Sequence, residues 1–152
     1  VANAVSIPVM GSGDVVDRAS AEQRLVGKVA GLFIGRASMS NPLVFSEVMS
    51  GAPSALRGNQ KLMLSILFRY IELLREDFQD SACPGKLKQL ASQMCRGAPW
   101  RKQLLTINTL PEQIQLLEMV RDGAWRGIIG GELVEEAPVR DEDGSCDQYA
   151  ME

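Results

Sequence analysis

Two short glycine-containing turns hold the residues of this chain that could bind an anion. The first is the stretch GSGD, Gly11 to Asp14, which follows an apolar run, and the second is IGR, Ile34 to Arg36, which follows the run GLF. Glycine lets the backbone approach a ligand closely, and backbone amides at such turns bind phosphate. The first turn alone is weak evidence, because it lacks the third glycine of a dinucleotide-binding fingerprint and a P-loop lysine. An ordinary tight strand-to-helix turn explains it as well.

The spacing of the two turns favours the phosphate interpretation. Gly13 and Gly35 are separated by the length of one compact β/α unit. In a (β/α)8 barrel, the loops after the last two strands reach the same rim and often bind phosphate there. Arg36 would add a positive charge and a forked set of donors. Asp14 has two interpretations, as part of this site or as the cap of the helix that follows it.

The elements that must position these turns alternate between strands and helices. The pattern predicts strands over residues 5–10 and 31–34, a helix over 16–28 and a turn over 35–41. A further helix over 42–50 begins with Asn41 as its cap and Pro42 in its first position. Such alternation predicts a parallel sheet with crossover helices, which two strands cannot complete. The chain also begins with Val1, so we expect it to be a piece of a longer protein.

The remainder of the chain is expected to be helical. After a turn-rich connection at 51–58, amphipathic patterns predict four helices, over residues 60–78, 84–96, 100–107 and 110–121. No strand signal occurs between residues 51 and 125. The predicted fold class is therefore α/β followed by all-α. It comprises the last two β/α units of a TIM barrel (1–50), a helical bundle domain (51–127) and an acidic tail expected to be disordered (128–152).

The charge of the chain is divided unevenly. The net charge is −3 over 152 residues, but residues 132–152 contain eight acidic residues and one basic residue. Residues 81–111 contain no acidic residue at all. They contain five basic residues that could contact nucleic acid phosphates: Lys86, Lys88, Arg96, Arg101 and Lys102. A solvated helix surface is the alternative for these five, but the absence of acidic residues favours RNA.

Composition excludes several classes of site. No apolar run approaches the roughly 18 residues of a membrane span, and no signal peptide is visible. The chain has no histidine and three cysteines, at Cys83, Cys95 and Cys146, without metal-ligand spacing. We therefore expect no metal, no histidine-dependent nucleophile and a reducing, cytoplasmic location.

The two turns also carry a resemblance to a known family. The texts VMGSGDVVD and GLFIGRASMSNPLVF resemble the end of the barrel in the flavin-dependent tRNA-dihydrouridine synthases, which have GNGD and GxxIGRxxxxNPxxF there. The segment KLKQLASQMCRGAPWRKQLLTINTLPEQ, residues 86–113, is similar to the central stretch of that family's basic C-terminal helical domain. The resemblance covers about residues 5–121.

The resemblance implies a function for each part. The loops would bind the phosphate of FMN, NADPH would reduce the flavin, and the flavin would reduce a uridine of tRNA to dihydrouridine after the base leaves its stack. Ser12 stands where the family has asparagine. The family's catalytic cysteine lies on an earlier barrel loop, so no catalytic residue is assigned here and we expect the fragment alone to be inactive. By motif position the phosphate-binding residues are Ser12, Gly13, Asp14, Gly35 and Arg36.

Two other functions remain open from the sequence. One is a barrel oxidoreductase that binds FMN or another phosphate but acts on a small molecule. The other is a non-catalytic protein that keeps only an RNA-binding or scaffold role. The basic helical region favours the tRNA-modifying enzyme over the first alternative, and a truncated sequence is a simpler account than a degenerate protein.

Overall fold

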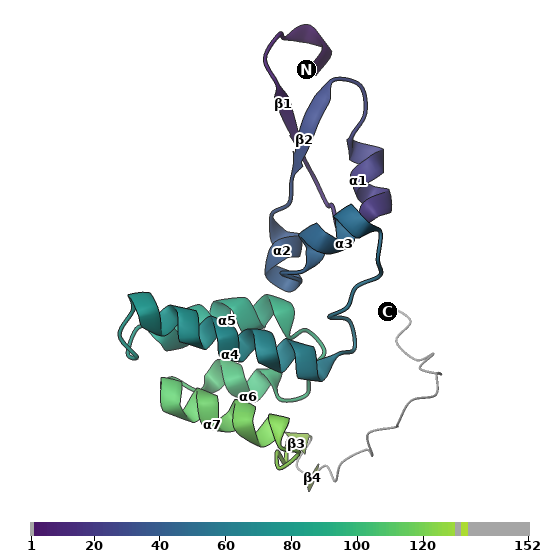
Figure 1. Ribbon diagram of the computed structural model, residues 1–152. Coiled ribbons are helices and arrows are strands. Elements are labelled where there is room, and N and C mark those ends of the chain that lie inside the picture. The colour runs from purple at the N-terminus through teal and green to yellow at the C-terminus, as the bar shows by residue number, and fades with distance from the viewer. Residues whose placement is uncertain (1, 130–131, 134–152) are drawn as a thin grey trace.

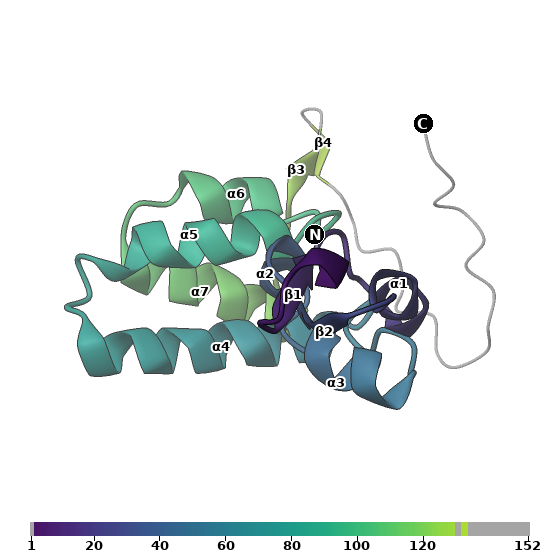
Figure 2. The ribbon, with the colours of Figure 1, turned by 90° about the horizontal axis from the view of Figure 1, so that it is seen from above.

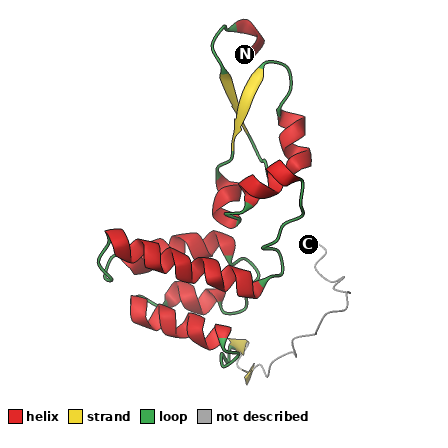
Figure 3. Ribbon diagram, in the orientation of Figure 1, coloured by secondary structure: helices red, strands yellow, loops and turns green. Residues whose placement is uncertain are grey.

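The chain forms a small β/α region followed by a helical region (Figure 1). The computed structural model describes residues 2–129 and 132–133. Helices dominate the described residues, and the longer strands lie near the N-terminus (Figure 3). The element order therefore agrees with an α/β part followed by an all-α part. The strands of the β/α region form a two-stranded sheet, not a closed barrel.

The β/α region is built on two parallel strands. β1 (Val9–Ser12) pairs with β2 (Val29–Phe33), and Ser12 lies opposite Phe33 at the end of the ladder. The expected first strand, 5–10, therefore starts and ends too early, and a 3-10 helix η1 (Ala2–Ala4) precedes it. Pro8 has no amide hydrogen to donate to a ladder, so pairing begins only after it. Both strands end at the same edge of the sheet, where the two glycine turns begin.

Helix α1 (Arg18–Arg24) connects the two strands. It is shorter than the expected helix over 16–28, because its N-terminus is set by a capping box. The side chain of Asp17 accepts a hydrogen bond from the amide of Ser20, and the Ser20 hydroxyl accepts one from the amide of Asp17. The cap is therefore Asp17, and Asp14 is left outside the helix.

Two short helices follow β2. The expected turn at 35–41 contains a helix, α2 (Arg36–Ser40), with Gly35 as its N-cap residue. α3 (Val44–Ser50) begins two residues later than expected, because Asn41 forms a local turn in which its side-chain oxygen accepts from the amide of Leu43. The carboxylate of Glu47, which is buried, accepts hydrogen bonds from the Asn41 side chain at 2.6 Å and from the amide of Ala55 at 2.8 Å. These bonds hold the connection between the two regions against α3.

The helical region contains four helices that pack around one apolar core. They are α4 (Gln60–Asp77), α5 (Cys83–Met94), α6 (Arg101–Thr106) and α7 (Leu110–Arg121). All four expected helices are present, with ends that differ by a few residues. The fully buried residues include Leu67, Leu87, Trp100, Leu104 and Leu117.

The two regions meet where α2 packs against α5. Seen from above, the β/α region lies over one end of the four helices (Figure 2). This packing brings the C-terminal end of α5 beside the turn that follows β2. Residues from both regions can therefore line one site.

A hairpin follows the last helix. β3 (Ile128–Ile129) pairs with β4 (Glu132–Leu133) in the antiparallel direction. This short hairpin opens the segment 128–152, for which disorder stays a prediction. The remaining acidic residues of the expected tail lie outside the described residues.

Candidate functional site

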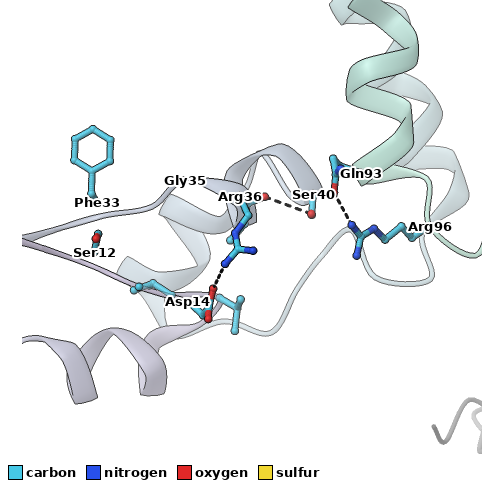
Figure 4. Close-up of a pocket in the computed structure, with 12 residues that line it drawn as sticks. Ser12, Asp14, Phe33, Gly35, Arg36, Ser40, Gln93 and Arg96 are labelled. Carbon is cyan, nitrogen blue, oxygen red and sulfur yellow. Dashed lines mark hydrogen bonds and ion pairs between the residues drawn. The ribbon is translucent and has the colours of Figure 1, made fainter. Parts of the chain in front are cut away.

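One hollow contains all five residues that the sequence assigns to phosphate binding (Figure 4). Its volume is about 660 Å³, and it opens at the edge of the sheet where β1 and β2 end. Residues from the first turn, the second turn and the helical region line it. The lining residues are Ser12, Gly13, Asp14, Val15, Val16, Phe33, Gly35, Arg36, Ala37, Ser40, Gln93 and Arg96. The two turns thus face one space, as the barrel interpretation requires.

The first turn leaves β1 sharply. Gly13 has a φ of 146°, a conformation that residues with a Cβ rarely adopt. A Cβ built on Gly13 would also lie 3.3 Å from Cζ of Arg24. Val15 is almost fully buried and anchors the turn, while Ser12 and Asp14 remain exposed beside the hollow. The turn therefore holds its backbone and its polar side chains at the mouth of the site.

The second turn leads directly into α2. Nothing lies within 4 Å of a Cβ built on Gly35, so the backbone there faces open space. Gly35 is the N-cap residue, and the amides of Arg36 and Ala37 in the first turn of a helix have no acceptor within that helix. The Ser38 hydroxyl donates to the carbonyl oxygen of Gly35 at 2.7 Å and stabilises this start.

An ion pair joins the two turns across the mouth of the hollow. Nη2 of Arg36 lies 2.9 Å from Oδ1 of Asp14. The two side chains are 90% and 78% exposed, so water screens their attraction strongly. Such a pair can open at little cost, which leaves the Arg36 guanidinium free to turn toward an anion in the hollow.

The helical region supplies the remaining charge of the site. Gln93, in the last turn of α5, and Arg96, just after that helix, line the hollow opposite Arg36 and Asp14 (Figure 4). The side-chain oxygen of Gln93 accepts a hydrogen bond of 2.7 Å from Nη2 of Arg96. The sequence did not predict a role for Gln93. It predicted that Arg96 contacts RNA, but not that Arg96 belongs to the phosphate site. No sequence signal could have found their position, because it depends on the packing of α2 on α5.

The other basic residues predicted to bind RNA do not line the hollow. The ammonium group of Lys86 lies 4.1 Å from the centroid of the Phe78 ring, and that of Lys88 donates to Oδ1 of Asn108 at 2.7 Å. Lys102 is exposed on α6. Arg101 is half-buried, and its Nη2 donates to the carbonyl oxygen of Ser92 at 2.9 Å, so it ties α6 to α5.

The five basic residues lie on two helices and on the segment between them. Lys86 and Lys88 leave α5 in directions about 160° apart, because two residues turn an α-helix by about 200°. Arg96 follows the end of α5, and the last helical residue, Met94, is eight residues or about 12 Å along the helix from Lys86. The structure therefore places one of the five basic residues at the hollow, two in the first half of α5 and two at the start of α6.

Neither described cysteine is part of the site. Cys83 and Cys95 are fully buried in the core of the helical region and form no disulfide with each other. Burial raises the pKa of the Cys95 thiol to about 12, because the charged thiolate is poorly solvated there. This thiol therefore stays protonated and unreactive at neutral pH. Cys146 lies outside the described residues.

Metal-ligating clusters and membrane spans are both absent from the described residues. No group of three or more acidic, cysteine or histidine side chains in this part of the chain could hold a metal ion. Within the same residues, no helix combines the length and the apolar character that a membrane span requires.

Comparison with known proteins identifies the family. No curated protein matches the chain. The chain does match the family described as dihydrouridine synthase (Dus), over residues 1–123. This match includes both turns, the hollow and the four helices, and it agrees with the resemblance carried by the GSGD and IGR stretches. The chain therefore belongs to the dihydrouridine synthase family.

Proposed function

We propose that this chain forms the flavin-phosphate end and a tRNA-facing part of an FMN-dependent tRNA-dihydrouridine synthase that uses NADPH. The observation that carries the proposal is that Ser12, Gly13, Asp14, Gly35 and Arg36 line one hollow at the ends of two parallel strands. Family membership supports a uridine-reducing oxidoreductase. The glycine turns and the charges that line the hollow support FMN binding. The exposed basic residues support contacts with tRNA, and the exposed apolar side chains support a larger barrel.

The hollow suits a phosphate monoester. Its backbone is open at Gly35, and the first amides of α2 lack acceptors within the helix. Two arginines and one aspartate line it, which leaves an excess of positive charge. A phosphate monoester carries a charge of about −2 at neutral pH and accepts several hydrogen bonds. The residues present therefore fit the phosphate end of FMN, with Arg36 as its main charged partner.

The FMN ring would supply the redox chemistry, passing a hydride between NADPH and the uracil base. This chain's own residues would hold the phosphate and so fix the position of the flavin. Neither Cys83 nor Cys95 lines the hollow. The proposal therefore assigns the catalytic cysteine to neither of them and expects it on another barrel loop.

The surface of the β/α region supports a larger barrel. Parallel sheets are normally buried on both faces, but here large apolar side chains lie exposed on the two strands and their helices. Phe33 on β2 and Met49 on α3 are 69% and 77% exposed, and Ile7, just before β1, is 70% exposed. We propose that further β/α units of the full-length enzyme cover these side chains and complete the (β/α)8 barrel.

The basic residues of the helical region would contact tRNA. Lys86, Lys88 and Lys102 lie away from the hollow, on α5 and α6. Contacts between lysine and phosphate position a nucleic acid without reading its sequence. The target base would leave its stack to reach the flavin, so these lysines would hold the tRNA while the base enters the barrel.

The test uses the full-length protein with FMN, NADPH and unmodified tRNA. We expect uridine to be converted to dihydrouridine, detected as a mass increase of two hydrogens in nucleosides released from the tRNA. We also expect FMN to bind more tightly than riboflavin, which lacks the phosphate. Arg36→Gln should weaken FMN binding about 10-fold or more, as expected for the loss of a hydrogen bond from a charged group. Arg57→Gln, an exposed change outside the hollow, is the matched control.

Two results would contradict the proposal. Equal affinity for FMN and riboflavin would exclude the phosphate role of the hollow. Reduction of a small-molecule substrate without any dihydrouridine in tRNA would favour the other barrel oxidoreductase.

A further inference from the structure

We propose that Arg96, oriented by Gln93, is a second cationic arm of the phosphate hollow, so that the helical region takes part directly in holding the flavin phosphate. The inference rests on the proposed function and adds a residue from outside the β/α region. Its ligand class is a phosphate monoester. Arg96 is then a binding residue, and Gln93 is a positioning residue that acts through it.

The place of Arg96 in the fold supports a role at the hollow. Arg96 follows α5, in the helical region, yet it lines the same hollow as Gly13, Gly35 and Arg36. The packing of α2 against α5 produces this arrangement. The guanidinium therefore lies on the side of the hollow opposite Arg36 (Figure 4).

The orientation of the Arg96 side chain also suits a ligand. One Nη2 donor of Arg96 binds the side-chain oxygen of Gln93 at 2.7 Å. A guanidinium has five N–H donors in a rigid plane, so the others remain for a ligand. Gln93 itself lines the hollow. The bond thus restrains the arginine where its free donors can meet a phosphate oxygen, which lowers the entropy lost on binding.

A phosphate dianion in the hollow would need a cation besides Arg36. Asp14 pairs with Arg36, so the two turns together bring no net charge to the hollow. Among the described residues that line the hollow, Arg96 is the cation that carries no ion pair. A phosphate monoester has a charge of about −2. Without Arg96 the ligand would face a neutral pair, and with it the site has the excess positive charge that a dianion needs.

The alternative ligand for Arg96 is the backbone of tRNA. Lys86 lies in the first turn of α5, eight residues or about 12 Å along the helix before its last residue, Met94, and Arg96 follows that end. Arg96 is therefore separated from that lysine and close to the flavin-phosphate turns. This position favours the monoester, and affinity measurements separate the two ligands.

The test measures the affinities of FMN, riboflavin and bulk tRNA for the full-length protein, using flavin fluorescence and filter binding. We expect Arg96→Gln to weaken FMN binding about 10- to 150-fold, the range for a hydrogen bond to a charged group. Riboflavin binding should not change. Arg57→Gln, the same chemical change on the exposed 51–58 connection, should alter neither affinity. Circular dichroism and the fluorescence of the buried Trp100 report whether each variant folds.

Gln93→Leu provides an independent measurement. It should weaken FMN binding less than Arg96→Gln does, about 2- to 4-fold, because the arginine keeps its charge and loses only the bond that orients it. Combined with Arg96→Gln it should have no additional effect, because the two residues act as a unit. A purely structural role of Gln93 would instead add its effect in the double variant and would lower riboflavin affinity too.

These measurements separate a failure of the proposed function from a failure of the role proposed for Arg96. If the wild-type protein binds FMN no better than riboflavin, the proposed function fails and this inference fails with it. If the wild type prefers FMN but Arg96→Gln binds FMN normally, only this inference is overturned. A loss of tRNA affinity with FMN affinity intact would assign Arg96 to the RNA surface, which also overturns it.

Discussion

Nη2 of Arg36 and Oδ1 of Asp14 lie 2.9 Å apart, and this pair joins two turns that are 22 residues apart in the chain. Each residue comes directly after the glycine of its own turn. The pair therefore shows that both turns reach the same point in space. It also places a negative charge beside the guanidinium on which the phosphate proposal depends most.

The first prediction concerns that negative charge. Asp14→Asn should tighten FMN binding about 2- to 5-fold, the range of an exposed charge pair, because it removes a carboxylate from the hollow and frees Arg36. The gain should shrink at high salt, where charges are screened. Titration of FMN at low and high ionic strength measures both effects. Weaker binding in the variant would show instead that Asp14 is needed to orient Arg36.

The second prediction concerns the backbone of the first turn. Gly13→Ala should destabilise the fold by about 1–3 kcal/mol, because alanine at a φ of 146° is strained. The new methyl group would also press on the Arg24 guanidinium. Gly35→Ala is the comparison, since its Cβ would meet nothing within 4 Å and its φ is negative. Urea unfolding compares the two, and equal losses would contradict the prediction.

The third prediction concerns tRNA. Lys86→Gln, Lys88→Gln and Lys102→Gln should each reduce the slope of log affinity against log salt by about 0.7–0.9 for every phosphate that the lysine neutralises. Lys28→Gln, an exposed change in the β/α region, should leave the slope unchanged. Arg101→Gln should mainly lower stability, because its guanidinium binds the carbonyl oxygen of Ser92. Filter binding of bulk tRNA over a salt series gives the slopes, and unchanged slopes in all three variants would exclude these lysines as phosphate contacts.

The fourth prediction concerns pH. The pKa of the Cys95 thiol is about 12 in the fold, against an ordinary value of 9.0. The folded state therefore keeps its proton where the unfolded chain loses it. This contribution to stability is complete below about pH 9 and is lost progressively as the pH rises toward 12, at about 1.4 kcal/mol per unit.

Urea unfolding at rising alkaline pH tests this dependence. The wild type should lose more stability between about pH 8 and about pH 10 than Cys95→Ala does, because only the wild type carries the thiol. Iodoacetamide should modify Cys95 only after unfolding, since the side chain is fully buried. Rapid modification of the native protein would contradict the buried position.

The fifth prediction concerns helix ends. The side chain of Asn59 accepts a hydrogen bond of 2.9 Å from the amide of Leu62 at the start of α4. Asn59→Ala should therefore cost about 0.5–2 kcal/mol of unfolding free energy. Thr109→Ala should cost less, because the Thr109 hydroxyl donates to the side chain of Glu112 and caps no backbone amide. Thermal unfolding of the two variants measures the difference, and a larger loss for Thr109→Ala would contradict the capping argument.

Local chemistry explains which elements could be predicted. Asn59 marks the start of α4, and Pro111 lies at the start of α7, because caps and proline act through their nearest neighbours in the chain. The first strand and α1 were less predictable at their ends. Pro8 delayed β1, and a reciprocal bond between Asp17 and Ser20 started α1 later than the apolar pattern indicated.

The sequence by itself determined the two glycine turns, the order of strands and helices, the basic stretch and the family resemblance. These depend on residue type and spacing, which determine local conformation and appear directly in the chain. Only the tertiary structure decided that the turns share one hollow with Gln93 and Arg96, that Arg36 pairs with Asp14, and that Arg96 is the member of the basic stretch that lines the hollow. Those relations arise from the parallel pairing of β1 with β2 and the packing of α2 on α5. Both join segments that are distant in the chain, and no local pattern encodes them.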